Sequence, residues 1–200
     1  MAAERSRAFY ARPVAEVARE LLGAHLRHGP VTLRITEVEA YGTPDTASHT
    51  RFGRTRRNAA MWGPPGHLYV YLCYGVHQMV NVVCEVEGQG AAVLIRAAEP
   101  VRGLEVIRKR RGDKTGPVLL TGPGKVGAAL GIDTSWSGHD LCEPAGVGIL
   151  EGGRPDGVLV GPRVGVNYAE PADRDASLRF AVADTPWVSH RRFLALEPRR

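Results

Sequence analysis

Alternation of apolar and polar residues predicts a strand that starts at Val31 and leads toward a pocket. Its first odd positions are apolar: Val31, Leu33 and Ile35. Side chains two residues apart share one face of a strand, so Glu37, Glu39 and Tyr41 are expected to continue this inward-facing row. The pattern therefore carries two carboxylates and a phenol toward the end of the strand, where a core often opens into a pocket.

Periodicities of three to four residues predict three helices, and short apolar runs predict five further strands. The helices span residues 13–22, 104–111 and 121–130, and the strands span 68–73, 80–86, 92–97, 163–168 and 178–183. His25 and His28 are expected in an exposed link, because nothing nearby completes a metal site. The glycine- and proline-rich stretch 42–65 predicts a long loop with at most short helical turns.

The strands at 68–73, 80–86 and 92–97 are separated by short turns, which predicts an antiparallel meander. Tyr71 then lies opposite Asn81, and Asn81 opposite Arg96, with a register uncertain by about two residues. Polar and aromatic side chains from three neighbouring strands are thus expected in one place. Tyr74 lies at a turn beside Gly75, where an aromatic ring can contact a partner.

Length and charge narrow the class of protein. The 200 residues suffice for one domain with a hydrophobic core, taken to span residues 1–200. Of the 26 basic residues three are lysines, so arginine dominates the net charge of +5. Arginine suits bidentate phosphate contacts, but a GC-rich genome gives the same bias, and the sequence does not separate these interpretations. No apolar stretch approaches a membrane span and residues 1–12 lack an apolar targeting core, so we expect a cytoplasmic, nucleoid-associated protein without a membrane partner.

Basic residues gather in two candidate phosphate-binding segments. The long loop contains four arginines within seven residues: Arg51, Arg54, Arg56 and Arg57. The last predicted helix opens with Gly-Pro-Gly-Lys125, but Val126 stands where a phosphate-loop motif requires Ser or Thr. A glycine-rich helix start with a lysine can still hold a single backbone phosphate.

Several ordered motifs together resemble one family. They are EVEAY at 37–41, ASH at 47–49, GRT at 53–55, GPPGHLYVY at 63–71, YG at 74–75, Asn81, LIRAAEP at 94–100, GPGK at 122–125 and RVGV at 163–166. The set covers almost the whole chain and resembles the alkyladenine (3-methyladenine) DNA glycosylases. The resemblance implies a single mixed α+β domain, built on a curved antiparallel sheet with surrounding helices and working without a metal or organic cofactor.

The resemblance also implies a function and its two catalytic residues. The partner would be double-stranded DNA with a damaged purine, which a monomeric enzyme flips out before hydrolysing the N-glycosidic bond. Glu39 would activate the attacking water and stabilise the developing sugar cation. Arg96 would orient Glu39 and keep it ionised. Glu37, on the same predicted row, is the alternative base, and either carboxylate could instead form a salt bridge with arginine.

Binding roles follow from the same resemblance. Tyr41, His49 and Tyr71 would stack on the extruded purine, Asn81 would reject the exocyclic amino group of guanine, and Tyr74 would fill the gap in the duplex. The DNA-binding residues are completed by Arg51, Arg54, Arg56, Arg57 and Lys125. Compared with the family pattern, this chain has one residue fewer between Tyr41 and His49, and Arg56 stands where proline is common.

Two rival functions and one mechanistic choice follow from the residues. A damage-binding module that no longer cleaves would not need both Glu39 and Arg96. A nuclease or phosphotransferase would need an acidic cluster with metal spacing, which is not evident.

Glycosylases that also cut the strand use an amine nucleophile, and the three lysines lie far from Glu39 in sequence. We therefore predict a monofunctional enzyme that uses water, with the preferred lesion left open among 3-methyladenine, 7-methylguanine, hypoxanthine and ethenoadenine.

Overall fold

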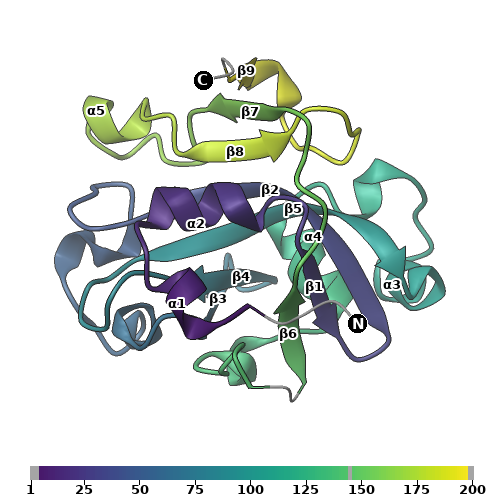
Figure 1. Cartoon of the computed structure of the whole chain (residues 1–200), viewed down its shortest axis with the longest axis horizontal. Helices are drawn as coiled ribbons and strands as arrows, with labels where there is room; N and C mark the ends of the chain where they lie inside the picture. Colours follow the sequence, from purple (N-terminus) through teal and green to yellow (C-terminus); the bar gives the residue numbers. More distant parts are fainter. Residues whose placement is uncertain (1–4, 144–145, 198–200) are drawn as a thin grey trace.

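Two long antiparallel strands, β2 (Val31–Tyr41) and β5 (Ala92–Arg102), form the centre of the sheet. The computed structural model describes residues 5–143 and 146–197. Within these ranges nine strands form one sheet in the order β3-β4-β5-β2-β8-β7-β9, and β1 joins β2 to β6 as a side branch (Figure 1). All of the pairings are antiparallel, and the sheet is open. The predicted α+β class is therefore confirmed, while the domain limits 1–200 remain a prediction.

The remaining elements are short. The other strands are β1 (His25–His28), β3 (Leu68–Cys73), β4 (His77–Val83), β6 (Val147–Leu150), β7 (Val158–Gly161), β8 (Arg179–Val182) and β9 (Ala195–Leu196). The α-helices are α1 (Arg7–Tyr10), α2 (Val14–Leu21), α3 (Leu104–Arg110), α4 (Pro123–Leu130) and α5 (Pro171–Arg174). Single 3-10 turns are η1 (His49–Phe52), η2 (Ala59–Trp62), η3 (Pro117–Leu119), η4 (Thr134–Trp136) and η5 (Arg191–Phe193). None of the described helices is long and apolar enough to cross a membrane.

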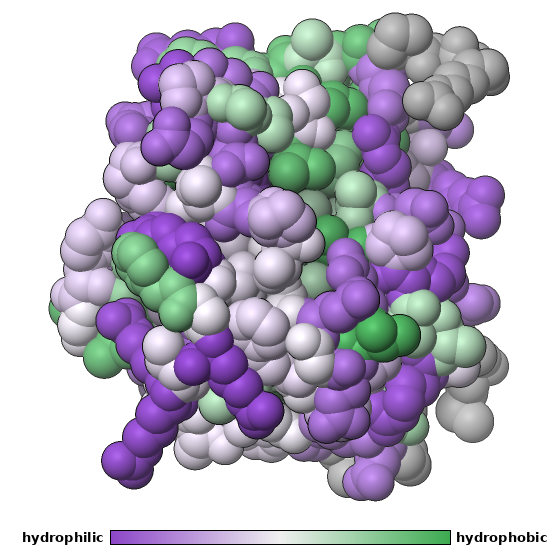
Figure 2. Space-filling model, turned by 90° about the vertical axis from the view of Figure 1, so that its left-hand side faces the viewer, coloured by the Kyte–Doolittle hydropathy of each residue, from purple (hydrophilic) through white to green (hydrophobic). Residues whose placement is uncertain are grey.

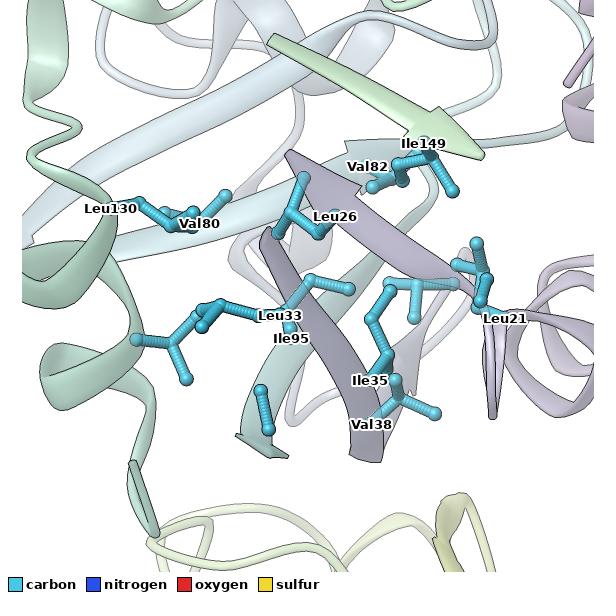
Figure 3. Close-up of a cluster of buried hydrophobic side chains, with 14 of the residues drawn as sticks. Leu21, Leu26, Leu33, Ile35, Val38, Val80, Val82, Ile95, Leu130 and Ile149 are labelled. Atoms are coloured by element: carbon cyan, nitrogen blue, oxygen red, sulfur yellow. The ribbon is translucent and has the colours of Figure 1, made fainter. Parts of the chain in front are cut away.

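The main core lies between the sheet, α2 and α4. Figure 3 shows side chains from these elements meeting, among them Leu21 of α2, Leu33 and Val38 of β2, Ile95 of β5 and Leu130 of α4. α2 buries one apolar face, as its period predicts. α4 can approach β4 closely because Gly127 has no Cβ atom. A Cβ atom at this position would lie 2.4 Å from the backbone oxygen of Gln78.

A β-bulge overturns the predicted continuation of the apolar row in β2. Ile35 pairs with Ala98 and Glu37 with Ala97, so Thr36 is an extra residue, and Arg96 is the extra residue on β5 one step later. The core therefore takes Ile35 and then Val38, which moves Glu37 to the opposite face. The same shift places Glu39 and Tyr41 in a cavity on that face rather than in line with the core.

Most of the other predicted elements are confirmed, with two clear exceptions. The three helices, the meander β3-β4-β5 and the strand at 178–183 are all present, although β4 begins and ends about three residues earlier than predicted. The expected link around His25 and His28 is wrong, because these residues form β1 between β2 and β6. The expected strand at 163–168 is also wrong. The strand in this region is β7, which ends at Gly161, and the backbone then turns at Gly165, whose φ is +81°.

Candidate active site

A cavity of about 440 Å³ opens on the face of the meander opposite the core. Its lining includes Glu39 and Tyr41 from β2, Tyr71 from β3, Asn81 from β4 and Arg96 from β5. His49 from η1 and Tyr74 from the β3–β4 turn also reach it. All seven residues predicted to act in catalysis, base binding or wedging therefore line one cavity.

The register explains why these side chains meet. Asn81 pairs with Tyr69 and with Leu94, each two residues from the predicted partners Tyr71 and Arg96. A shift of two residues keeps every side chain on its predicted face, because side chains alternate with a period of two. The meander therefore gathers the expected groups despite the offset.

Glu39 is fully buried at the inner end of the cavity and is held by donors from three segments. Its Oε1 atom accepts a hydrogen bond from the backbone N–H of Val164 at 2.8 Å, and its Oε2 atom accepts one from the Tyr41 hydroxyl at 2.9 Å. The Nη1 atom of Arg96 lies 3.4 Å from Oε1 and 3.5 Å from Oε2. The carboxylate is thus fixed in orientation, while the long contact to Arg96 leaves acceptor capacity for a further donor.

Glu37 is fully buried outside the cavity lining, in an ionic cluster that it shares with Arg96. The Nε atoms of Arg96 and Arg179 each lie 3.1 Å from its Oε1 atom. Ser189 donates from its backbone N–H at 2.6 Å and from its hydroxyl at 2.9 Å. Burial raises the pKa of the Glu37 carboxyl, and the two guanidinium groups and Ser189 oppose that rise. Two hydrogen bonds from Ser189 and two adjacent guanidinium cations all favour the carboxylate form.

Aromatic rings form the walls of the cavity. The His49 and Tyr71 rings lie 4.6 Å apart between centroids, and His49 Nδ1 lies 2.9 Å from the Tyr69 hydroxyl. Burial and the Arg57 and Arg51 cations lower the pKa of His49, which favours a neutral imidazole at neutral pH. Burial and the neighbouring Glu39 raise the pKa of Tyr41, so that its hydroxyl remains a donor.

Asn81 forms a fixed part of the wall. Its Nδ2 atom donates to the backbone oxygen of Tyr69 at 2.9 Å and to that of Met79 at 3.2 Å. The residue is buried, and two bonds to strand backbone hold the amide in place. A group that enters the cavity therefore meets a rigid side chain here.

The predicted DNA-binding residues lie around the mouth of the cavity or on nearby exposed segments. Tyr74 is 91% exposed and has a φ of +50°, so the turn projects its ring into solvent. Arg57 lines the cavity, and Arg51, Arg54 and Arg56 are exposed on the same loop. Lys125 lies near the N-terminus of α4, whose Pro123 lines the cavity, and burial together with Arg111 and Lys114 lowers its pKa. The loop forms the left-hand side of the molecule in Figure 1, and Figure 2 shows that this side carries hydrophilic residues around a middle of near-neutral hydropathy, with several hydrophobic side chains among them.

Sequence reasoning missed three buried groups that support the site. Arg163 pairs with Asp45 and donates to the backbone oxygen of Ala40 at 2.9 Å, which holds the 163–166 segment against β2. Arg179 lies opposite Glu39 in the β2–β8 pairing, and Ser189 follows β8. The RVGV motif contained one usable signal, because a glycine inside a predicted strand often marks a bend, and Gly165 has a φ of +81° in the structure. Nothing local marks Arg179 or Ser189.

The described residues contain no group of three or more histidine, cysteine or acidic side chains arranged to hold a metal ion. The acidic side chains nearest the cavity are instead bonded to arginine, serine, tyrosine and backbone donors. The chemistry of the site is therefore that of a buried carboxylate beside aromatic walls.

Comparison with known proteins identifies similar chains. The methylpurine-DNA glycosylase (MPG) family matches residues 8–186. The chain is 58% identical over 193 residues to the "Putative 3-methyladenine DNA glycosylase" of Nitrosococcus oceani, a match that covers 96% of this chain and 95% of that protein. It is 56% identical over 183 residues to the "DNA-3-methyladenine glycosylase" of Arabidopsis thaliana, covering 90% of this chain and 72% of that protein.

Proposed function

The chain belongs to the methylpurine-DNA glycosylase family and is a DNA glycosylase of base excision repair, and we propose that it flips alkylated or deaminated purines into the cavity and hydrolyses the N-glycosidic bond with water. The observation that carries this proposal is the position of Glu39, buried at the inner end of a cavity with aromatic walls. The cavity volume of about 440 Å³ lies in the range of small-molecule sites.

The proposed chemistry uses Glu39 as general base. A water that donates to the carboxylate on its cavity side would pass a proton to Glu39 as its oxygen bonds to C1′ of the sugar, while the C1′–N bond breaks and the bonding electron pair leaves with the purine. The negative charge of Glu39 would also stabilise the oxocarbenium character of the transition state, an effect that is strong in a site from which water is excluded. Arg96 and the N–H of Val164 hold the carboxylate in one orientation, so that little reorganisation is needed.

The proposed recognition of the base depends on stacking and exclusion. Tyr41, His49 and Tyr71 offer aromatic faces, and stacking contributes about 1–3 kcal/mol per base. A neutral His49 avoids repelling a cationic alkylated purine. Asn81, fixed by its two backbone contacts, would exclude the amino group of guanine. Tyr74, exposed at its turn, would fill the space that the flipped nucleotide leaves.

Water is the proposed nucleophile because no lysine is found among the described residues that line the cavity. An amine nucleophile would form a Schiff base with the sugar, and borohydride would then trap the protein on DNA. We expect no trapped adduct and an intact abasic site as product. A borohydride-stable adduct between this protein and its DNA would refute the monofunctional mechanism.

The decisive experiment measures single-turnover release of hypoxanthine or 3-methyladenine from a defined duplex. Wild-type protein is expected to release the base, and Glu39→Gln to lose release while still binding the duplex. Glu99→Gln is the matched control, because Glu99 is a carboxylate on β5 that pairs with Arg34 outside the cavity. Undiminished release by Glu39→Gln would contradict the role of this residue. A competition among 3-methyladenine, 7-methylguanine, hypoxanthine and ethenoadenine then defines the preferred lesion.

A further inference from the structure

Three exposed side chains stack on one another at the mouth of the cavity. The guanidinium carbon of Arg51 lies 4.6 Å from the centroid of the Phe52 ring and 4.3 Å from that of the Tyr168 ring. Phe52 is 78% exposed and Tyr168 is 58% exposed. Tyr168 also lines the cavity, so the group, here called the Arg51 stack, borders the opening.

The Arg51 stack is ordered by contacts that do not use the hydrogen-bonding edge of Arg51. The Tyr168 hydroxyl donates to the backbone oxygen of Ala47 at 2.8 Å, which anchors the ring. The guanidinium carbon lies over both rings, and within the described part of the chain a single long hydrogen bond of 3.5 Å runs from the Nη1 atom of Arg51 to the backbone oxygen of Thr46. Most of the five N–H donors of Arg51 thus stay available, and their planar fork suits two oxygens of a phosphate.

Stability of the fold does not explain this arrangement. A phenylalanine that is mostly exposed contributes little burial, and the Arg51–Phe52 contact is worth little when solvated. Moreover, none of the four arginines between positions 51 and 57 forms an ion pair with a carboxylate of the described chain. An exposed cluster of uncompensated cations beside the cavity fits a polyanionic partner.

We propose that the Arg51 stack is a preformed phosphate clamp, in which Phe52 and Tyr168 hold Arg51 in position to bind the DNA backbone beside the nucleotide that enters the cavity. This inference rests on the proposed function and adds two aromatic residues to the DNA interface. The rings act through Arg51, because they reduce the rotamer freedom that a long side chain would otherwise lose on binding.

The test measures affinity for a duplex that contains a tetrahydrofuran abasic analogue, over a range of salt concentrations. Arg51→Ala is expected to weaken binding and to lower the slope of log K against log salt by about 0.9, the value for one phosphate contact. Phe52→Ala is expected to weaken binding by about threefold to tenfold with an unchanged slope, since no charge is lost. The double variant is expected to bind little worse than Arg51→Ala alone.

A chemical substitution in the DNA locates the contact. Replacing the phosphates on either side of the lesion, one at a time, with neutral methylphosphonates is expected to weaken binding of wild-type protein at one position. At that position, the same replacement is expected to leave the affinity of Arg51→Ala for DNA unchanged. The matched control is the Arg192–Phe193 pair, with a 4.7 Å contact and a ring that is 52% exposed, which does not line the cavity. Arg192→Ala and Phe193→Ala are expected to retain wild-type affinity.

The clamp and the proposed function fail in different ways. If wild-type protein releases the base but Arg51→Ala and Phe52→Ala bind DNA normally, the clamp is refuted and the glycosylase mechanism stands. Equal loss of affinity in the Arg192 and Phe193 variants would also refute it, because any exposed pair would then have the same effect. If wild-type protein releases no base, but a methylphosphonate weakens DNA binding by wild-type protein and not by Arg51→Ala, the clamp is supported and the glycosylase mechanism is refuted.

Discussion

The buried cluster of Glu37, Arg96, Arg179 and Ser189 should respond strongly to the loss of a single charge. The substitution Glu37→Gln keeps the size of the side chain but replaces one carboxylate oxygen with a donor. In the native cluster the carboxylate accepts hydrogen bonds from the backbone N–H and the hydroxyl of Ser189 at 2.6 and 2.9 Å, and the Nε atoms of Arg96 and Arg179 each lie 3.1 Å from its Oε1 atom as ion pairs. The new amide would therefore place a donor against donors and leave two buried guanidinium groups with less compensating charge.

The expected loss in the free energy of unfolding follows from the burial of the cluster. Removing one partner of a buried ion pair costs about 3–5 kcal/mol, because the remaining charge is left without compensation away from water. A domain of this kind is stable by about 5–15 kcal/mol, so the loss would be a large share of the total. Arg179 adds to the effect, since its side chain is fully buried and burial already lowers its pKa.

Urea denaturation followed by circular dichroism measures the change in the free energy of unfolding. Glu99→Gln is the control, because the Arg34–Glu99 pair has the same 3.1 Å separation but both side chains are partly exposed. Exposed pairs contribute about 0.2–1 kcal/mol, so this variant should unfold near the wild-type midpoint. If Glu37→Gln and Glu99→Gln lose similar small amounts of stability, the reasoning from burial is wrong.

Three further expectations test the loop and the packing of α4. The pKa of His49 lies below its usual value near 6.5, so Arg57→Ala, which removes a neighbouring cation, is expected to raise it in an NMR titration. Because the folded pKa of His49 is lowered, its contribution to stability is fully present above the unfolded pKa and is lost as pH falls through the folded pKa. An unchanged His49 pKa in Arg57→Ala would argue against an effect of the Arg57 charge. Arg56→Ala should lower the salt slope of DNA binding by about 0.9, whereas an unchanged slope would remove Arg56 from the interface. Gly127→Ala should destabilise the protein by about 1–3 kcal/mol in urea, despite the better helix propensity of alanine, because the new Cβ meets the backbone of Gln78; a gain in stability would show that α4 can move away.

The structure separates two uses of arginine that the composition leaves mixed. Arg96, Arg163 and Arg179 are buried and pair with carboxylates, where a planar, permanently charged group can bond to several partners at once. The arginines of the 51–57 segment are exposed. A bias from genome composition alone does not explain why the buried positions carry arginine, since each of these guanidinium groups forms an ion pair with a buried carboxylate.

The sequence by itself determined the class of fold and the cavity residues expected to act in catalysis and base binding. Alternation in β3, β4 and β5 predicted the meander, and a register error of two residues did no harm, because it preserves the face of every side chain. The motifs located Glu39, Tyr41, His49, Tyr71, Asn81 and Arg96, all of which the structure brings to one cavity. Local pattern was sufficient for the meander, because strand period and turn chemistry are local properties, whereas the roles of the cavity residues were inferred from the resemblance of the ordered motifs to a family.

Only the tertiary structure decided which face the carboxylates take and what Glu37 does. Parity placed Glu37 and Glu39 on the row of Ile35, but the bulge at Thr36 adds a residue and reverses the faces, and the sequence of one strand does not reveal how its neighbour pairs. Glu37 then meets Arg179 and Ser189, which are more than 140 residues away in sequence. Contacts of that separation depend on how the whole chain packs, so no local pattern predicts them.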